Sequence, residues 1–136
     1  MAVVVFDSDV IIGFLNADDA HHADAVGLVR ESLTPGTRRM LSAVNYSEVL
    51  IGPIKAGKDA RDHVEAMLGS FSIEIMVIDG AFARRAAAVR ARTDLKLPDA
   101  YALATAIHAE HNGHDDVRLA SFDRAVLRAH AELHPN

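Results

Sequence analysis

Apolar runs along the chain predict its strands. Residues 2–6 are continuously apolar and rich in valine, without the alternation that is typical of a half-exposed strand. Such a run is typical of a parallel strand that is covered on both faces. Residues 73–78 and 117–120 form further short, mostly apolar runs, and a short strand is expected near residues 39–41. We therefore expect a sheet of four to five short strands.

Apolar residues at helical spacing predict helices between these strands. Ser42 can cap a helix, Pro98 suits a first helical position, and Gly113 can end a helix. The predicted helices cover residues 8–15, 21–33, 43–55, 59–71, 81–93, 98–112 and 124–133. Because strands and helices alternate, we expect an α/β/α sandwich around a mostly parallel sheet. A length of 136 residues favours a single domain, residues 1–136.

Three acidic residues are expected to face inward, although acidic residues on helices normally face solvent. Asp99 precedes Leu103 by four positions and so lies at the start of the apolar stripe of its helix. Glu48 and Asp123 have apolar residues at similar helical spacings. An inward carboxylate costs several kcal/mol unless it is paired or binds a metal ion.

Asp7 and Asp9 add two more carboxylates directly after the first predicted strand. Parallel sheets bind ligands at the carboxyl ends of their strands. We therefore expect one cluster at this edge of the sheet, formed by Asp7, Asp9, Glu48, Asp99 and Asp123. Mg²⁺ and Mn²⁺ prefer oxygen ligands, so the joint pattern favours a site for one of these ions.

Most of these carboxylates also have a purely structural interpretation. Asp99 follows Pro98, which is a common start of a helix, and Asp7 and Asp123 could each cap the helix that follows. Asp79, after the third strand, is expected only to cap its helix. The metal-site interpretation therefore rests on the carboxylates taken together.

Charge and composition restrict the possible partners. The chain has 19 acidic and 14 basic residues, and its net charge of −5 by itself disfavours a nucleic-acid partner. Without the five clustered carboxylates, however, acidic and basic residues are equal in number, so RNA and DNA are not excluded. The absence of cysteine excludes disulfide bonds and thiolate metal sites. No apolar run could span a membrane and no secretion signal is evident, so we expect a cytoplasmic protein without a membrane partner.

The order of these acidic residues resembles that of the PIN-domain nucleases, specifically the VapC-type toxins of type II toxin–antitoxin modules. The resemblance covers nearly the whole chain. Four stretches carry it: DSDVII with Asp7, SEVL with Glu48, LKLPDAYALATA with Asp99, and LASFD with Asp123.

This resemblance implies a PIN-like fold and an endoribonuclease that uses Mg²⁺ or Mn²⁺ to hydrolyse RNA with a metal-activated water. It also implies a VapB-type antitoxin partner and a homodimer. The catalytic, metal-binding residues would be Asp7, Glu48, Asp99 and Asp123. Asp9 would lie beside them, and Ser121 would orient a carboxylate or a water.

Two other functions stay open. VVVFDSDVI also resembles the first motif of haloacid-dehalogenase-type phosphotransferases, in which Asp7 would be the nucleophile and Asp9 the acid/base. That family needs paired acids after a later strand, whereas Asp115 and Asp116 precede one. The other possibility is a non-catalytic, partner-binding α/β domain whose acidic residues are only structural.

Two groups of basic residues need an explanation. His108, His111 and His114 suggest a zinc site, but Gly113 would break the helix between them, so we do not expect one. Four cations that precede Asp99 could contact phosphate or simply face solvent. These are Arg85, Arg90, Arg92 and Lys96.

Overall fold

The computed structural model describes residues 2–133 and contains one parallel sheet. Its strands are Ala2–Phe6 (β1), Thr37–Ser42 (β2), Ile73–Met76 (β3) and Asp116–Ala120 (β4). They are ordered β3-β2-β1-β4, and every neighbouring pair is parallel. The helices are Ser8–Leu15 (α1), His22–Ser32 (α2), Ala43–Ala56 (α3), Lys58–Ser70 (α4), Gly80–Arg92 (α5), Leu97–His111 (α6) and Arg124–Leu133 (α7). The expected α/β fold is confirmed.

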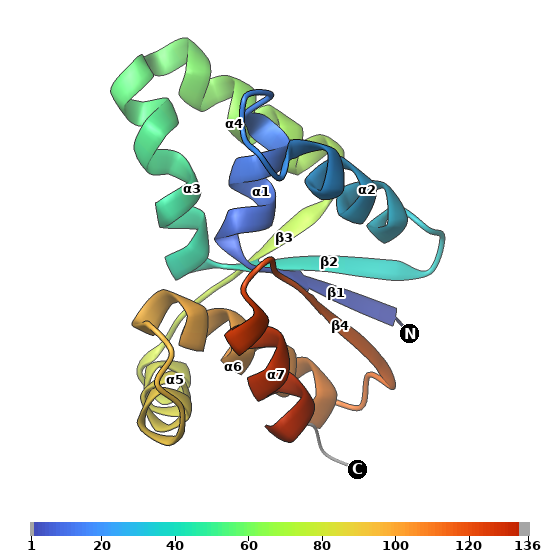
Figure 1. The fold of residues 1–136 in the computed structure, drawn as a ribbon, viewed down its shortest axis with the longest axis vertical. Helices are drawn as coiled ribbons and strands as arrows, with labels where there is room; N and C mark the ends of the chain where they lie inside the picture. The colour runs from blue at the N-terminus through green and yellow to red at the C-terminus, as the bar shows by residue number, and fades with distance from the viewer. Residues whose placement is uncertain (1, 134–136) are drawn as a thin grey trace.

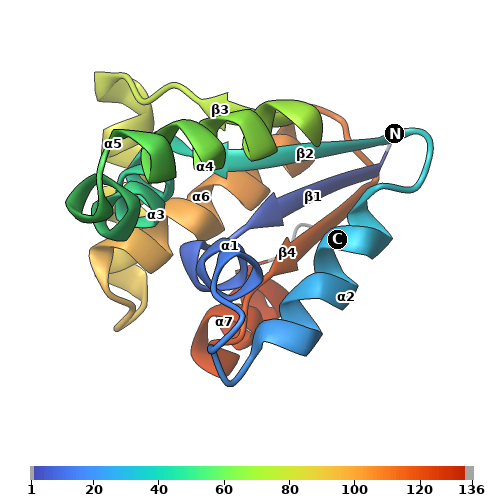
Figure 2. The same ribbon diagram turned by 90° about the horizontal axis from the view of Figure 1, so that it is seen from above.

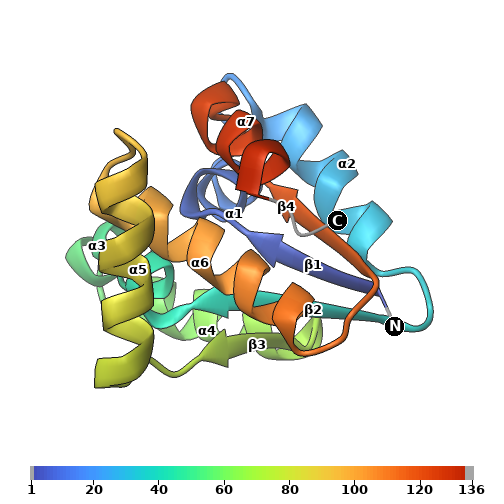
Figure 3. The ribbon, with the colours of Figure 1, turned by 90° about the horizontal axis from the view of Figure 1, so that it is seen from below.

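The helices form two layers, one on each face of the sheet. Helices α1 to α4 cover one face and α5 to α7 cover the other, which Figure 1 shows above and below the strands. Figure 2 views the layer of α1 to α4 from above, and Figure 3 shows α6 running across the opposite face between α5 and α7. The strands are therefore enclosed between helices, as their apolar sequence requires.

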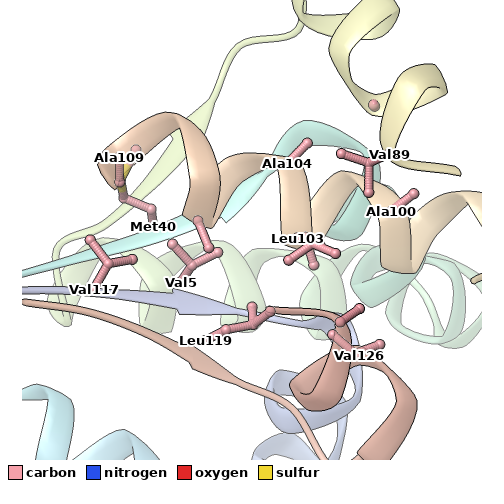
Figure 4. Packing of buried hydrophobic residues seen from close by; sticks show 14 of the residues in the cluster. Val5, Met40, Val89, Ala100, Leu103, Ala104, Ala109, Val117, Leu119 and Val126 are labelled. Atoms are coloured by element: carbon pink, nitrogen blue, oxygen red, sulfur yellow. The ribbon is translucent and has the colours of Figure 1, made fainter. Parts of the chain in front are cut away.

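Strand β1 is packed on both faces. Val3 and Val5 are fully buried in the core under α5 to α7, and Phe6 is fully buried in the core under α1 to α4. In Figure 4, Val5 lies in the same apolar layer as Leu103 of α6 and Leu119 of β4. The continuous valine run thus reflects packing on both sides of a central strand.

Three strands differ in length from the expectation, and β4 differs only by starting one residue earlier, at Asp116. Strand β2 is longer than residues 39–41 because it pairs with β1 along one side and β3 along the other. Strand β3 ends at Met76 instead of residue 78, because it is an edge strand and Asp79 already caps α5. Val77 is consequently 80% exposed.

The strand order brings several chain segments together at one edge. Because β1 lies between β2 and β4, the connections from β1 and β4 leave the sheet next to each other at their carboxyl ends. This is the kind of position where parallel sheets form ligand sites.

No helix among residues 2–133 is long and apolar enough to span a membrane.

Candidate active site

Asp7 occupies the point where β1 passes into α1. It is the N-cap of α1, and its Oδ1 accepts a 2.9 Å hydrogen bond from the backbone N–H of Ser8. Its own backbone N–H donates to the carbonyl of Ala120 at 2.9 Å, which continues the pairing of β1 with β4. The residue is only 1% exposed. Backbone pairing therefore fixes a buried carboxyl group at the edge of the sheet.

The segment after β4 holds both Asp7 and Asp9. Ser121 Oγ donates to Asp7 Oδ2 at 2.8 Å, and the backbone N–H of Phe122 donates to Asp9 Oδ2 at 3.0 Å. The ring of Phe122 is stacked against His21, with centroids 4.6 Å apart. Asp9 Oδ1 is buried and has no hydrogen-bond partner among the described residues. One carboxylate oxygen of the site is therefore left without a donor.

Glu48 reaches the same place from α3. Ser8 Oγ donates to Glu48 Oε1 at 2.8 Å, and Asn45 Nδ2 approaches the same oxygen at 3.3 Å. Asn45 Nδ2 also donates to the backbone carbonyl of Pro98 at 3.1 Å. Since Asp99 follows Pro98, the buried Asn45 ties Glu48 to the start of α6.

Burial, and then repulsion among these groups, perturbs their ionisation. Burial and the neighbouring Asp9 raise the pKa of Asp7 from 3.8 to about 7. Burial, together with the charges of Asp123 and Glu48, also raises the pKa of Asp99, although a side-chain hydrogen bond with Asp7 and the charge of Lys96 oppose this shift. Because Asp7 and Asp99 influence each other, their ionisations are linked.

Asp9 is perturbed in the same direction. Burial is the main reason that its pKa is raised, and the charges of Asp99 and Asp123 add to it, while backbone hydrogen bonds from Phe122 and Val10 work against it. The cluster thus concentrates negative charge that the surrounding protein does not neutralise. A bound cation would remove this repulsion.

The inward orientation expected for Asp123 is wrong. Asp123 is exposed and precedes α7, and its Oδ1 accepts a 2.8 Å hydrogen bond from the backbone N–H of Ala125. The helical spacing argument fails because the residue lies outside the helix and caps it. Its charge is nevertheless close enough to raise the pKa of both Asp99 and Asp9.

The chemistry of the donor set fits a hard divalent ion. Carboxylate oxygens from α1, α3, α6 and the segment after β4 act on one another, and Asp9 Oδ1 lacks a donor. Oxygen ligands of this kind suit Mg²⁺ and Mn²⁺. Among residues 2–133, however, no group of three or more Asp, Glu or His side chains is already arranged to hold a metal ion. The fit therefore rests on donor chemistry and uncompensated charge.

Other candidate residues take the expected structural roles. Asp79 accepts a 2.8 Å hydrogen bond from the backbone N–H of Phe82 and caps α5. Asp116 begins β4, so Asp115 and Asp116 lie at the amino end of that strand, away from Asp7. At that end of the strand, Asp115 and Asp116 cannot serve as the paired acids that a phosphotransferase of the haloacid-dehalogenase type needs near Asp7.

The sequence patterns missed two residues that support the carboxylates. Ser8 and Asn45 both contact Glu48, and Asn45 is fully buried. Asn45 lies three residues before Glu48 on the same helix, and such residues share one face. The sequence could therefore have predicted the contact between these two side chains. Ser8 offered no comparable signal, because its partner lies 40 positions away.

Comparisons with solved structures agree with this architecture. The chain is similar to VapC20 of Mycobacterium tuberculosis, described as a Sarcin-Ricin loop cleaving toxin, with a TM-score of 0.68, 21% identity and 95% of each chain covered. It is also similar to a chain of a toxin-antitoxin complex from Klebsiella pneumoniae, with a TM-score of 0.63 and 25% identity over 90% of this chain and 87% of the other. A comparison with curated proteins finds no match.

The family comparison extends over nearly the entire described chain. The PIN domain matches residues 4–133, from β1 to the end of α7. This range includes every carboxylate of the candidate site. The resemblance to VapC-type PIN proteins is confirmed, and the chain belongs to the PIN domain family.

Proposed function

We propose that this protein is a Mg²⁺- or Mn²⁺-dependent endoribonuclease that acts as the toxin of a toxin–antitoxin module. One observation carries the proposal: the buried Asp7 meets the charges of Asp9 and Asp99 at the carboxyl end of β1, and its pKa rises to about 7. A metal-free role gives no reason to keep so much unpaired negative charge at this edge. Membership of the PIN domain family supports nuclease chemistry.

Asp7, Glu48 and Asp99 would hold the divalent ion, with Asp9 beside them and Asp123 at the exposed rim. The bound ion would acidify a water molecule and offset negative charge on the phosphodiester group. Ser121 holds Asp7, while Ser8 and Asn45 hold Glu48, so two of these carboxylates are oriented before any ligand binds. Such preorganisation lowers the cost of reaching the reactive geometry.

The proposed partners follow from the related structures. The similar Klebsiella pneumoniae chain comes from a toxin-antitoxin complex, and a more distant match, with 13% identity and a TM-score of 0.50, is VapBC2 of Rickettsia felis. We therefore propose a VapB-type antitoxin as a partner. From the resemblance to VapC-type toxins we add an RNA substrate and a second copy of this chain to the proposal. The protein would act in the cytoplasm as a single PIN-like domain.

Cleavage of end-labelled structured RNAs tests the proposal. Antitoxin-free protein is expected to cut RNA with Mg²⁺ or Mn²⁺ and not with EDTA, and Asp99→Asn should lose this activity. Asp79→Asn is the matched control, because asparagine still caps a helix and Asp79 lies outside the cluster. Full metal-dependent activity in Asp99→Asn would overturn the proposed site. Hydrolysis of a phosphate monoester without any RNA cleavage would favour the phosphotransferase instead.

A further inference from the structure

A basic pocket is lined by residues of α5, α6 and the end of α7. Figure 3 shows these three helices on the face of the sheet opposite α1 to α4. Its volume is about 380 Å³, within the range of small-ligand sites. Four basic side chains line it: Arg85 and Arg92 from α5, and His108 and His111 from α6. The other lining residues include Val89, Ala104 and Ile107. The lining therefore combines cationic groups with an apolar surface and includes no acidic residue.

Helix α5 concentrates positive charge in a chain whose net charge is −5. It has no acidic residue, and its four arginines are exposed. These are Arg84, Arg85, Arg90 and Arg92. Within residues 2–133, none of them forms an ion pair with a carboxylate, whereas Arg38 and Arg118 on the sheet do. The charge on α5 is thus available to an anion from outside the chain.

The guanidinium of Arg85 is held in place at the pocket. Arg85 Nη1 donates to His108 Nδ1 at 3.0 Å, and the side chain of Asn112 lies 3.0 Å from His108 Nε2. Burial and the nearby Arg85 charge lower the pKa of His108, which agrees with a neutral ring that accepts from Arg85. Among the described residues, the other N–H groups of Arg85 have no acceptor, so this side chain suits a phosphate group.

The pocket is connected to the acidic cluster along α6. Asp99 lies in the first turn of this helix and His108 nine residues later, which corresponds to roughly 14 Å along the axis. Lys96 is at the N-cap position of the helix, without a side-chain capping hydrogen bond, and its charge is close enough to lower the pKa of Asp99. Arg92 ends α5 just before this loop. Arg92 and Lys96 thus place positive charge at both ends of the loop between the pocket and the acidic cluster, although the exposed Asp94 lies between them.

We propose that this pocket binds a nucleotide of the RNA substrate away from the scissile bond. Arg85 and Arg92 lie about 10 Å apart along α5 and contact successive phosphates of the strand, and the ribose or base between them packs on Val89 and Ile107. Single-stranded RNA needs both of these features, a positively charged track and surfaces on which its bases pack. The inference rests on the proposed ribonuclease function and adds a second contact that selects longer RNA.

The test measures binding of a long single-stranded RNA to the Asp99→Asn protein by fluorescence anisotropy. Adding Arg85→Ala and Arg92→Ala is expected to weaken binding at least tenfold and to reduce the slope of log K against log salt by about 1 to 1.5, because two phosphate contacts are lost. The control adds Arg30→Ala and Lys58→Ala, which remove the same charge from exposed positions on α2 and α4. This control should bind like the parent.

The first two outcomes test the pocket separately from the cleavage site, and the third tests both. If wild type cleaves RNA but the pocket variant and the control variant bind it equally well, the pocket inference is wrong and the nuclease stands. If the pocket variant loses a co-purifying protein and keeps its affinity for RNA, the surface binds protein and the inference is also overturned. A parent that neither binds nor cleaves any RNA would overturn the proposed function, and the pocket inference with it.

Discussion

Ser121 and Asp7 are 114 positions apart in the chain, yet the hydroxyl of Ser121 donates a 2.8 Å hydrogen bond to Asp7 Oδ2. The same oxygen of Ser121 accepts from the backbone N–H of Asp123 at 3.0 Å. Pairing of β1 with β4 makes this contact possible, because Phe6 is in register with Ala120. The hydroxyl thus joins the two strand ends that form the candidate site.

Ser121→Ala is expected to lower activity without unfolding the protein. Loss of the hydroxyl removes a hydrogen bond that lowers the pKa of Asp7, so that carboxyl would hold its proton more strongly and bind metal less well. We expect roughly a 10- to 100-fold loss of metal affinity or activity. RNA cleavage measured at increasing Mn²⁺ concentrations gives the size of this loss. Ser121→Thr keeps the hydroxyl and should retain most of the wild-type activity. Equal activity in Ser121→Ala would show that the hydroxyl is dispensable.

Asp7→Asn is expected to abolish cleavage and to stabilise the metal-free protein. Asparagine can still accept from the Ser8 N–H and contact Ser121, but it removes a buried charge that Asp9 repels. Near pH 8 the melting temperature of the metal-free variant should rise by roughly 10 to 15 °C. Calorimetry in EDTA measures the rise. Added Mn²⁺ should stabilise the wild type and leave the variant nearly unchanged, and an equal response of both would exclude Asp7 as a ligand.

The raised pKa of Asp7 predicts how the free energy of unfolding of the metal-free protein depends on pH. The pKa of Asp7 is about 7 in the folded protein and near 3.8 when unfolded, so the folded state binds more protons between these values. Without metal, this group therefore stabilises the fold at low pH, and the contribution is lost as pH rises from about 4 through 7, on the order of 4 kcal/mol. Asp9 and Asp99, whose pKa values are also raised, act in the same direction.

Denaturant unfolding at several pH values tests this prediction. Glu74 works in the opposite direction, because its hydrogen bond with Arg38 lowers the pKa of Glu74. The difference between wild type and Asp7→Asn therefore isolates the contribution of Asp7. That difference should grow between pH 5 and pH 8 in EDTA and shrink when Mn²⁺ is added. A difference that does not vary with pH would contradict the raised pKa.

The sequence predicted those parts of the site that depend on regular periodicity. Asp7 could be placed because it follows a buried strand, and Glu48 and Asp99 because helical spacing put them beside apolar neighbours. The contact between Ser8 and Glu48 depends on how α1 packs against α3, which no local pattern encodes. The basic pocket around Arg85 likewise needs the packing of α5 on α6.

Asp123 shows where such reasoning fails. Spacing to the apolar residues after it suggested an inward position, but that argument applies only inside a helix. Its side chain instead caps α7, an alternative that the sequence had also offered. A capping role and a role at the site are compatible, because the charge of Asp123 still raises the pKa of Asp99.

Two substitutions at Asp123 separate these roles. Asp123→Asn keeps a side-chain oxygen that can cap α7, so its unfolding free energy should match wild type, whereas Asp123→Ala should lose about 1 kcal/mol. Both variants remove the charge near Asp99 and should lower metal-dependent cleavage, although less than Asp99→Asn does, because Asp123 is exposed. Cleavage rates at several Mn²⁺ concentrations, together with denaturant unfolding, measure both effects. If Asp123→Asn cleaves RNA as fast as wild type at every Mn²⁺ concentration, Asp123 is a helix cap and the metal site consists of the other carboxylates.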